Sequence, residues 1–205
     1  MSRLSLFRIS GWGLAALGVL ALVGLFWTNL NFVETNPGGN DFLPRWVGAR
    51  QFISEGISPY SQESTLAIQE AIYGRPAAEG QDQALFAYPF YTIILIYPFT
   101  LIDSFNVARA QWMTLAEIAI VAIALLGTRL ANWKASRNTL VAFLLFALLW
   151  YHGAKPLVDG NLSVLVALLV TVALYALKTK QDGLAGMCLA LSTIKPQMAI
   201  WIIPL

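Results

Sequence analysis

A single carboxylate, Asp41, lies in the segment Gly38-Gly39-Asn40-Asp41-Phe42, shortly after the first apolar run of the chain. A carboxylate at the beginning of a helix stays ionised, and an ionised carboxylate can act as a general base. The same position suits an ordinary helix cap, because Asn and Asp side chains accept hydrogen bonds from the first backbone amides. Both interpretations apply to Asp41, and they do not exclude each other.

A second group of polar residues, His152, Lys155, Asp159 and Asn161, is expected in a short loop between two membrane spans. A lone histidine at the end of a span is either an interfacial residue or a proton-transfer group. A lysine in this position either extends to lipid headgroups or binds a phosphate. The loop is therefore a candidate for contact with an anionic substrate.

Lys195 lies inside the last apolar stretch, followed by Pro196 and Gln197. A lysine at such depth costs roughly 2.5–3.5 kcal/mol on membrane-insertion scales, so it usually marks a cavity or a charged partner. Two interpretations follow: a contact with a substrate phosphate, or an ion pair with Glu117. Arg109, at the start of its span, is either a further phosphate contact or an anchor.

The composition places the chain in the membrane. It is 58% hydrophobic and 12% charged, whereas soluble domains carry about 25% charged residues. The net charge of +2 comes without a basic patch, so no nucleic-acid partner is expected. One histidine and one cysteine provide no metal-binding cluster, and no glycine-rich phosphate loop is present. We therefore expect no metal and no nucleotide-sugar site.

Two topologies compete for the apolar stretches. The stretch 85–102 contains Pro89 and Pro98, and it either crosses the membrane, for six spans, or is re-entrant, for five. The five-span topology is favoured because it keeps both basic loops in the cytoplasm. It leaves residues 28–109 outside and the N-terminus inside. The apolar stretches are 9–27, 85–102, 110–126, 139–151, 161–177 and 183–205.

The external segment 28–109 is predicted to contain two short helices. Phe42, Trp46, Ala49 and Ile53 share one helical face, which should lie in the membrane surface. Ser61 can cap a second helix over 62–73, which Gly74 closes. The predicted fold is thus all-α: one transmembrane helical bundle over 1–205 with interfacial helices outside.

Several motifs resemble glycosyltransferase family 87, a family of GT-C-type membrane enzymes similar to polyprenol-phosphate-mannose-dependent mannosyltransferases. Their order and spacing carry the resemblance. Two departures occur: Tyr88-Pro89-Phe90 replaces Tyr-Pro-Pro, and Gly160-Asn161 replaces Gly-Gln. The family is about twice this length, so the chain is expected to be its N-terminal part. The motifs are Asn40-Asp41-Phe42, Ala49-Arg50, Gly56-Ile57-Ser58-Pro59-Tyr60, Ala87-Tyr88-Pro89, Asp159-Gly160-Asn161-Leu162-Ser163, Gly183-Leu184-Ala185-Gly186 and Ile194-Lys195-Pro196.

The resemblance implies a GT-C-like fold and transfer of a hexose, mannose by analogy, from a polyprenyl-phosphate donor to a glycan or glycolipid hydroxyl. Asp41 would be the general base of an inverting reaction at the external face of a bacterial plasma membrane. No cofactor other than the donor is implied, and membrane lipid is the surrounding partner. The residues implied in substrate binding are Arg50, Tyr60, Tyr88, His152, Lys155, Asn161, Lys195 and Gln197.

Two other functions remain open at this point. In a transporter or flippase for a lipid-linked or anionic substrate, Lys195, Glu117 and Arg109 would line a pathway. Transporters usually contain paired, interrupted helices in two related halves, and this sequence shows no such pairing. The other alternative is an inactive, truncated scaffold.

Overall fold

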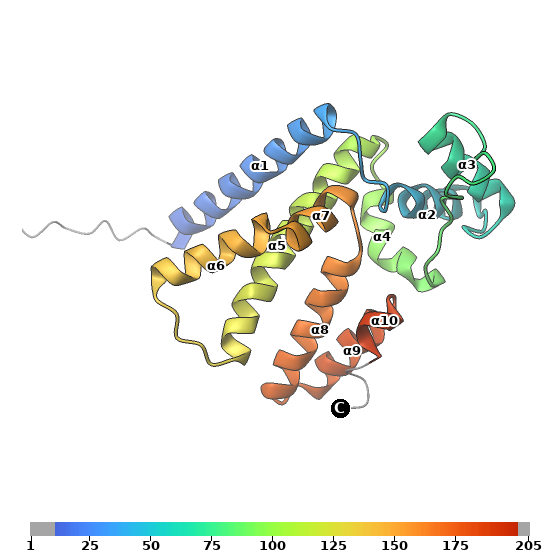
Figure 1. The fold of residues 1–205 in the computed structure, drawn as a ribbon. Helices are drawn as coiled ribbons and strands as arrows, with labels where there is room; N and C mark the ends of the chain where they lie inside the picture. The colour runs from blue at the N-terminus through green and yellow to red at the C-terminus, as the bar shows by residue number, and fades with distance from the viewer. Residues whose placement is uncertain (1–10, 201–205) are drawn as a thin grey trace, which may run out of the picture.

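The computed structural model describes residues 11–200, which fold into helices without a strand (Figure 1). The predicted all-α class is therefore confirmed for this part of the chain. A short 3-10 helix, η1 (Phe90–Thr92), leads into α4. The α-helices are α1 (Gly11–Thr35), α2 (Leu43–Glu55), α3 (Gln62–Tyr73), α4 (Ile93–Thr100), α5 (Phe105–Leu130), α6 (Arg137–Leu149), α7 (Tyr151–Asp159), α8 (Ser163–Lys178), α9 (Asp182–Ser192) and α10 (Pro196–Ala199).

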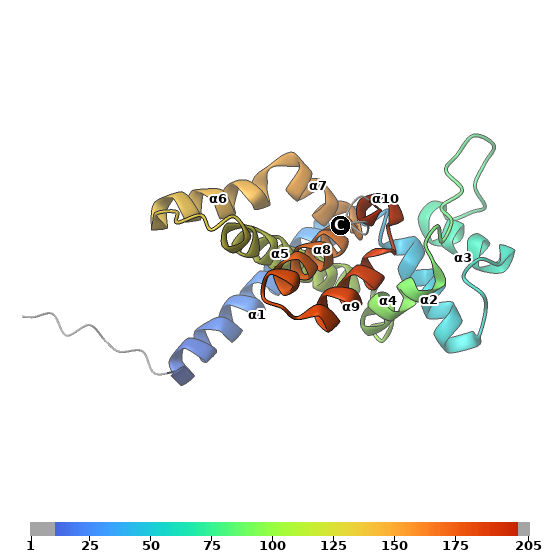
Figure 2. The same cartoon turned by 90° about the horizontal axis from the view of Figure 1, so that it is seen from below.

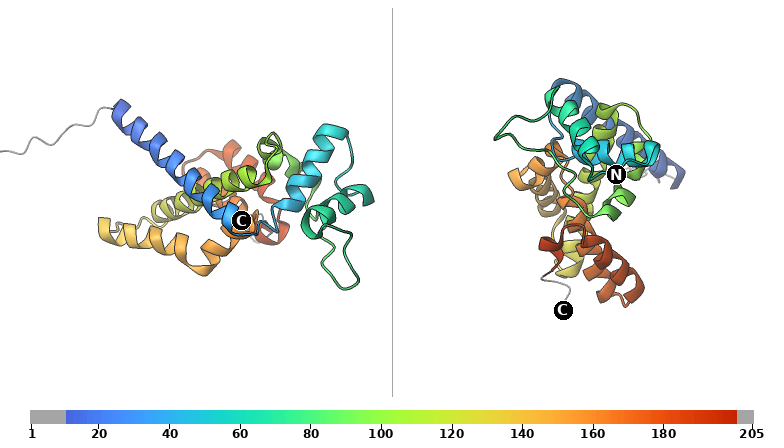
Figure 3. Two further views of the ribbon diagram at one scale, coloured as in Figure 1. Left: turned by 90° about the horizontal axis from the view of Figure 1, so that it is seen from above. Right: turned by 90° about the vertical axis from the view of Figure 1, so that its right-hand side faces the viewer.

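Helix α5 is the centre of the bundle. Helices α1 and α8 pack along it, α9 packs on α8, and the α6–α7 pair crosses beside it (Figures 1 and 2). Helices α2, α3 and α4 lie together at one end of the bundle, where α4 contacts α5; Figure 3 shows this end from two further sides. The α1–α2 connection, the α7–α8 turn and α10 also lie at this end, so residues far apart in sequence meet there.

Two helices, α1 and α5, are long and apolar enough to cross a membrane, and a third span exists if α6 and α7 count as one helix bent by 47°. Helix α8 has 16 residues, about 24 Å of length against a hydrocarbon core of about 30 Å. The count of candidate spans within residues 11–200 is thus lower than the five or six predicted. The outward faces of α1 are apolar and exposed, as with Trp12 and Leu20, which suits contact with lipid.

Three sequence-based boundaries were wrong, each for a local reason. Residues 151–159, predicted as a loop, form helix α7. The proline-containing stretch is helical only over 90–100, because Pro89 directly precedes η1. The last apolar stretch is not one continuous helix, because α9 ends at Ser192 and the chain turns before α10. Residues 201–205 of that stretch lie outside the described part.

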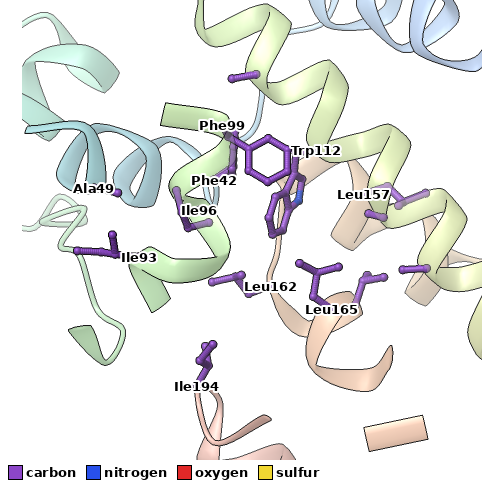
Figure 4. Close-up of a cluster of buried hydrophobic side chains, with 14 of the residues drawn as sticks. Phe42, Ala49, Ile93, Ile96, Phe99, Trp112, Leu157, Leu162, Leu165 and Ile194 are labelled. Carbon is purple, nitrogen blue, oxygen red and sulfur yellow. The ribbon is translucent and has the colours of Figure 1, made fainter. Parts of the chain in front are cut away.

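The core forms where α2, α4 and α5 meet (Figure 4). The Phe42 ring stacks on Trp112 with centroids 4.9 Å apart, and Phe99 packs edge-on against both rings. Phe42 is only 1% exposed, and Trp46 donates a hydrogen bond through Nε1 to the Phe99 carbonyl (2.9 Å). The face of α2 predicted to lie on the membrane thus packs largely against protein. This packing also anchors the residue next to Asp41.

Helix α3 forms as predicted. The Ser61 hydroxyl accepts a hydrogen bond from the Ser64 amide (3.1 Å), and Gly74 ends the helix in the left-handed region with φ 66°. Gln69, 4% exposed, fastens the following loop to α3: it donates to the Gln83 carbonyl (3.0 Å) and accepts from the Ala77 amide (2.8 Å).

The orientation of α6 and α7 is testable by cysteine labelling. In a Cys188→Ala background, we expect a membrane-impermeant maleimide to label Lys155→Cys in intact cells. Lys134→Cys should react only after permeabilisation, because the positive-inside rule keeps its basic loop in the cytoplasm. Both lysines are exposed, so burial does not account for a difference. Labelling of Lys134→Cys alone in intact cells would contradict this topology.

Candidate functional site

A chain of hydrogen bonds joins Asp41 to Lys195. Oδ2 of Asp41 accepts a bond from Nδ2 of Asn161 (2.5 Å), and Oδ1 of Asn161 accepts one from Nζ of Lys195 (2.8 Å). The Ser163 hydroxyl donates a hydrogen bond to the same Asn161 oxygen (2.6 Å). It also accepts a hydrogen bond from Nζ of Lys195 (2.6 Å). Three segments therefore converge: the α1–α2 connection, the α7–α8 turn and the α9–α10 break.

Asp41 does not cap helix α2. The N-cap residue is Phe42, and no side chain caps this helix end. The capping interpretation is therefore wrong, since the carboxylate is turned toward Asn161 instead. The side chain of Asp41 remains 38% exposed, so a substrate can reach it.

Backbone hydrogen bonds hold the Asp41 segment against the end of α7. The Asp41 amide donates to the Asp159 carbonyl (2.9 Å), and the Gly39 amide donates to the Val158 carbonyl (3.1 Å). These two bonds join segments more than 100 residues apart. They place the Asp41 side chain beside Asn161, the second residue after α7.

Arg109 fastens the same segment from α5. It is 1% exposed, and its guanidinium donates to the carbonyls of Asn36 (2.8 Å) and Val158 (3.1 Å). The buried guanidinium leaves no room for a side chain at position 38, because a Cβ on Gly38 would lie 2.6 Å from Nη2 of Arg109. Gly39 has φ +77° and is similarly close to the arginine stem. Arg109 is therefore an anchor of the Asp41 segment.

A glycine turn directs Asn161 toward Asp41. Gly160 ends α7 in the left-handed region with φ +72°, and the Asn161 amide donates back to the Pro156 carbonyl (2.9 Å). This is the usual glycine-terminated end of a helix. Oδ1 of Asn161 also accepts the Ser163 amide (2.9 Å), which orients the side chain at the start of α8.

The position of Lys195 follows from Pro196. A residue before proline is disfavoured in the helical region, and Lys195 has φ −119° and ψ 83°. It is thus placed in the break between α9 and α10 and not within a helix. The alternative of an ion pair with Glu117 is wrong, because Nζ of Lys195 donates to Asn161 and Ser163 instead, while Glu117 accepts a hydrogen bond from Asn29 (2.8 Å).

Two cavities lie on either side of Arg45. One, about 470 Å³, has Asp41 on its wall, together with Tyr73 and Asp82. The other, about 630 Å³, contains Lys195. Four predicted site residues line this second cavity together, and they come from three different segments: Tyr60, Tyr88, Lys195 and Gln197.

Arg45 was missed by the sequence analysis. Its Nη1 lies 3.9 Å from Oδ1 of Asp41 and donates to the Asp41 carbonyl (2.6 Å), while its guanidinium lies 4.5 Å from the Tyr88 ring centre. Nζ of Lys195 lies 5.7 Å from the centre of the same ring. Burial lowers the pKa of Arg45, and Tyr88 and Asp41 act in the opposite direction. Its spacing of four residues from Asp41 was the available signal.

Four predicted substrate-binding residues line neither cavity: Asn161, which belongs to the Asp41–Lys195 chain, and three others, Arg50, His152 and Lys155. Arg50 pairs with Asp103 (2.6 Å) and donates to the Ile102 carbonyl. His152 is exposed and packs edge-on against Trp150. Lys155 pairs with Asp159 four residues further on α7. The structure therefore does not join these side chains to the Asp41–Lys195 chain, and their substrate contacts stay predictions.

Within residues 11–200, no cluster of His, Cys, Asp and Glu side chains is arranged to hold a metal ion.

The fold and the site together define a helical membrane protein with a polar, two-cavity site at one end of its bundle. The family model for glycosyltransferase family 87 matches residues 86–205, more than half of the chain, and the protein belongs to that family. It is therefore a membrane glycosyltransferase. Neither a curated protein nor a solved structure gives a significant match. The matched range contains Tyr88, Asn161 and Lys195, whereas Asp41 and Arg45 precede it.

Two glycines provide a matched test of the Asp41 position. Gly160 and Gly56 both have φ +72°, but a Cβ on Gly160 would lie 2.4 Å from Cβ of Phe42, whereas nothing lies near Gly56. Gly56→Ala should cost about 1–2 kcal/mol for the left-handed conformation alone. Gly160→Ala should cost more and should also lower transferase activity, because the clash moves the Asp41 segment. Thermal unfolding in detergent and sugar transfer are the measurements, and equal effects of the two changes would contradict this role.

Proposed function

We propose that the protein transfers a hexose from a polyprenyl-phosphate donor to an acceptor hydroxyl at the external face, with inversion and with Asp41 as general base. The hydrogen-bond chain from Asp41 through Asn161 to Lys195 carries the proposal. It connects an exposed carboxylate with a cation-lined cavity, and a transfer from a phosphate donor needs both. Family membership favours this transferase over a transporter or flippase.

The cavity around Tyr88 suits the donor phosphate. Arg45 and Lys195 lie on its wall, and its described lining contains no acidic residue. Two cations in a partly dehydrated site attract an anion strongly, because the effective dielectric there is lower than in water. Gln197 and the Tyr60 hydroxyl add hydrogen-bonding groups to the same wall, although the Tyr60 hydroxyl already donates to the Tyr88 carbonyl (2.6 Å).

The proposed step is a single displacement. The carboxylate of Asp41 takes the proton of the acceptor hydroxyl as the hydroxyl oxygen attacks the anomeric carbon of the donor sugar. The bond between that carbon and the phosphate oxygen breaks, and its electron pair leaves with the polyprenyl phosphate. Arg45 and Lys195 stabilise the negative charge that develops on this leaving group. Attack opposite the leaving group inverts the anomeric centre.

Asn161 has two functions in this scheme. Its amide nitrogen donates to Asp41 and orients the carboxylate, and its amide oxygen accepts from Lys195. One side chain thus holds the base and the phosphate-binding cation at a fixed separation.

Replacement of the base should abolish most of the turnover. We expect Asp41→Asn to lower the rate of hexose transfer from a radiolabelled polyprenyl-phosphate sugar by about 10²–10⁴-fold, the usual contribution of a general base. The KM for the donor should change little, because Asn keeps the size of the side chain. Asp103→Asn is the control, since its side chain is 94% exposed and pairs with Arg50. Equal transfer by wild type and Asp41→Asn would remove Asp41 from the mechanism.

Replacement of the cation should act mainly on the donor. Lys195→Met is expected to raise the KM for the polyprenyl-phosphate sugar about tenfold or more through the lost charge–phosphate contact. Lys195→Arg should retain part of the affinity, because it restores the charge. Lys134→Met, at an exposed lysine in the α5–α6 connection, should leave donor affinity unchanged. An unchanged KM in Lys195→Met would show that the phosphate binds elsewhere.

A further inference from the structure

We propose that the two cavities sort the two substrates by charge, and that Asp82 is a specificity-determining residue that excludes anionic acceptors. This inference rests on the proposed function and names its acceptor class: an uncharged, hydroxyl-rich group such as a neutral sugar. The cavity beside Asp41 is the acceptor site, and the cavity around Tyr88 is the donor site. The two cavities adjoin, because Arg45 and Ala87 line both of them.

The charges on the two linings differ in sign. The cavity beside Asp41 contains two carboxylates, Asp41 and Asp82, against one guanidinium, Arg45. The other cavity contains Arg45 and Lys195 without an acidic residue. Arg45 lies 3.9 Å from the Asp41 carboxylate and offsets one of the two negative charges, so the charge of Asp82 leaves this lining negative overall. An anionic acceptor would therefore meet repulsion where an uncharged hydroxyl would not.

The wall that carries Asp82 is preorganised. The Tyr73 hydroxyl donates a hydrogen bond to the Asp82 carbonyl (2.9 Å), and Oδ1 of Asp82 accepts one from the Ala84 amide (2.9 Å). Ala84 has φ +50°, a left-handed conformation that is costly for alanine. Nε2 of Gln69 donates a hydrogen bond to the Gln83 carbonyl (3.0 Å). These contacts hold the Asp82 carboxylate at the cavity without involving Asp41 or Asn161.

The lining of this cavity suits a sugar in other respects. Its volume of about 470 Å³ lies within the range of about 300–1,000 Å³ for small-molecule sites. Hydrogen-bonding side chains alternate with apolar ones on the wall: Asn40, Tyr73 and Gln83 beside Pro44, Ile72 and Leu85. Such a mixture can bind the hydroxyls and the apolar faces of a pyranose.

Charged thiol reagents measure the sign of each cavity without any substrate. In a Cys188→Ala background, Leu85→Cys reports on the acceptor cavity and Gln197→Cys on the donor cavity. At low salt, Leu85→Cys should react faster with a cationic methanethiosulfonate than with an anionic one, by about tenfold after correction for their intrinsic rates. Gln197→Cys should show the opposite preference. Equal preferences at both positions would overturn the charge sorting.

Asp82→Asn tests which residue is responsible. It keeps an oxygen for the Ala84 amide but removes the charge, so the cationic preference at Leu85→Cys should fall several-fold. Glu79→Gln is the matched control, because Glu79 is exposed on the same loop and does not line the cavity. If Asp82→Asn and Glu79→Gln shift the preference equally, Asp82 has no special part in the site.

Paired acceptors test the consequence for specificity. The probes are methyl α-mannoside and its 6-phosphate, with a radiolabelled polyprenyl-phosphate hexose as donor. Wild type should prefer the neutral probe by about tenfold in kcat/KM, and Asp82→Asn should narrow that preference. Hydrolysis of the donor without acceptor is measured in parallel. Donor turnover with an unchanged preference would overturn the role of Asp82 alone, whereas no donor turnover would overturn the proposed function, and the reagent measurement would still decide the sign of each cavity.

Discussion

The site depends on one constraint: residues 36–42 are held against the carbonyl end of helix α7. Two backbone bonds to Val158 and Asp159 provide the register, and the buried guanidinium of Arg109 provides a third attachment. On the other side, burial of the Phe42 side chain contributes about 1.5–3 kcal/mol. Asp41 lies between these attachments, so its backbone is fixed while its carboxylate stays open to solvent.

Once Asp41 is placed, the polar chain to Lys195 determines what the site can do. A buried or half-buried lysine is costly without partners, and Asn161 and Ser163 supply them. Tyr88 adds a ring face toward both Arg45 and Lys195. The carboxylate and the two cations thus belong to one structural unit, although only part of that unit lies within the range of the family model. The polar chain therefore joins the part of the chain that the family model matches to the segment that precedes residue 86.

The sequence predicted the elements that depend on local signals. Helix α3 forms as expected because Ser61 and Gly74 are strong end signals, and the all-α class follows from the apolar runs. Lys195 lines a cavity, one of the two settings that the sequence indicated for it, and its contact with a phosphate stays a prediction. Its place in a helix break could have been inferred from Pro196, since the residue before a proline tends to leave the helix.

Other features depend on tertiary contacts and could not be read from the sequence. The short distance between Asp41 and Asn161 arises from the attachment of residues 36–42 to the end of α7 and to Arg109 of α5. His152 and Arg50 were expected to bind substrate together with Lys195, but each has another partner in the structure: the His152 ring packs edge-on against Trp150, and Arg50 pairs with Asp103. Fewer helices of residues 11–200 are long enough to cross a membrane than the five or six spans predicted, because apolar composition does not show where a helix breaks, as it does before Lys195.

The central claim is that Asn161 and Lys195 act on catalysis as one connected unit with Asp41. A double-mutant cycle tests it most directly, with kcat/KM for hexose transfer measured for Asn161→Ala, Lys195→Met and the double variant. We expect the effects of the two substitutions on kcat/KM to be strongly coupled. The double variant should therefore be little less active than the less active of the two single variants. Losses that multiply independently would contradict the connected site, even if each single variant were impaired.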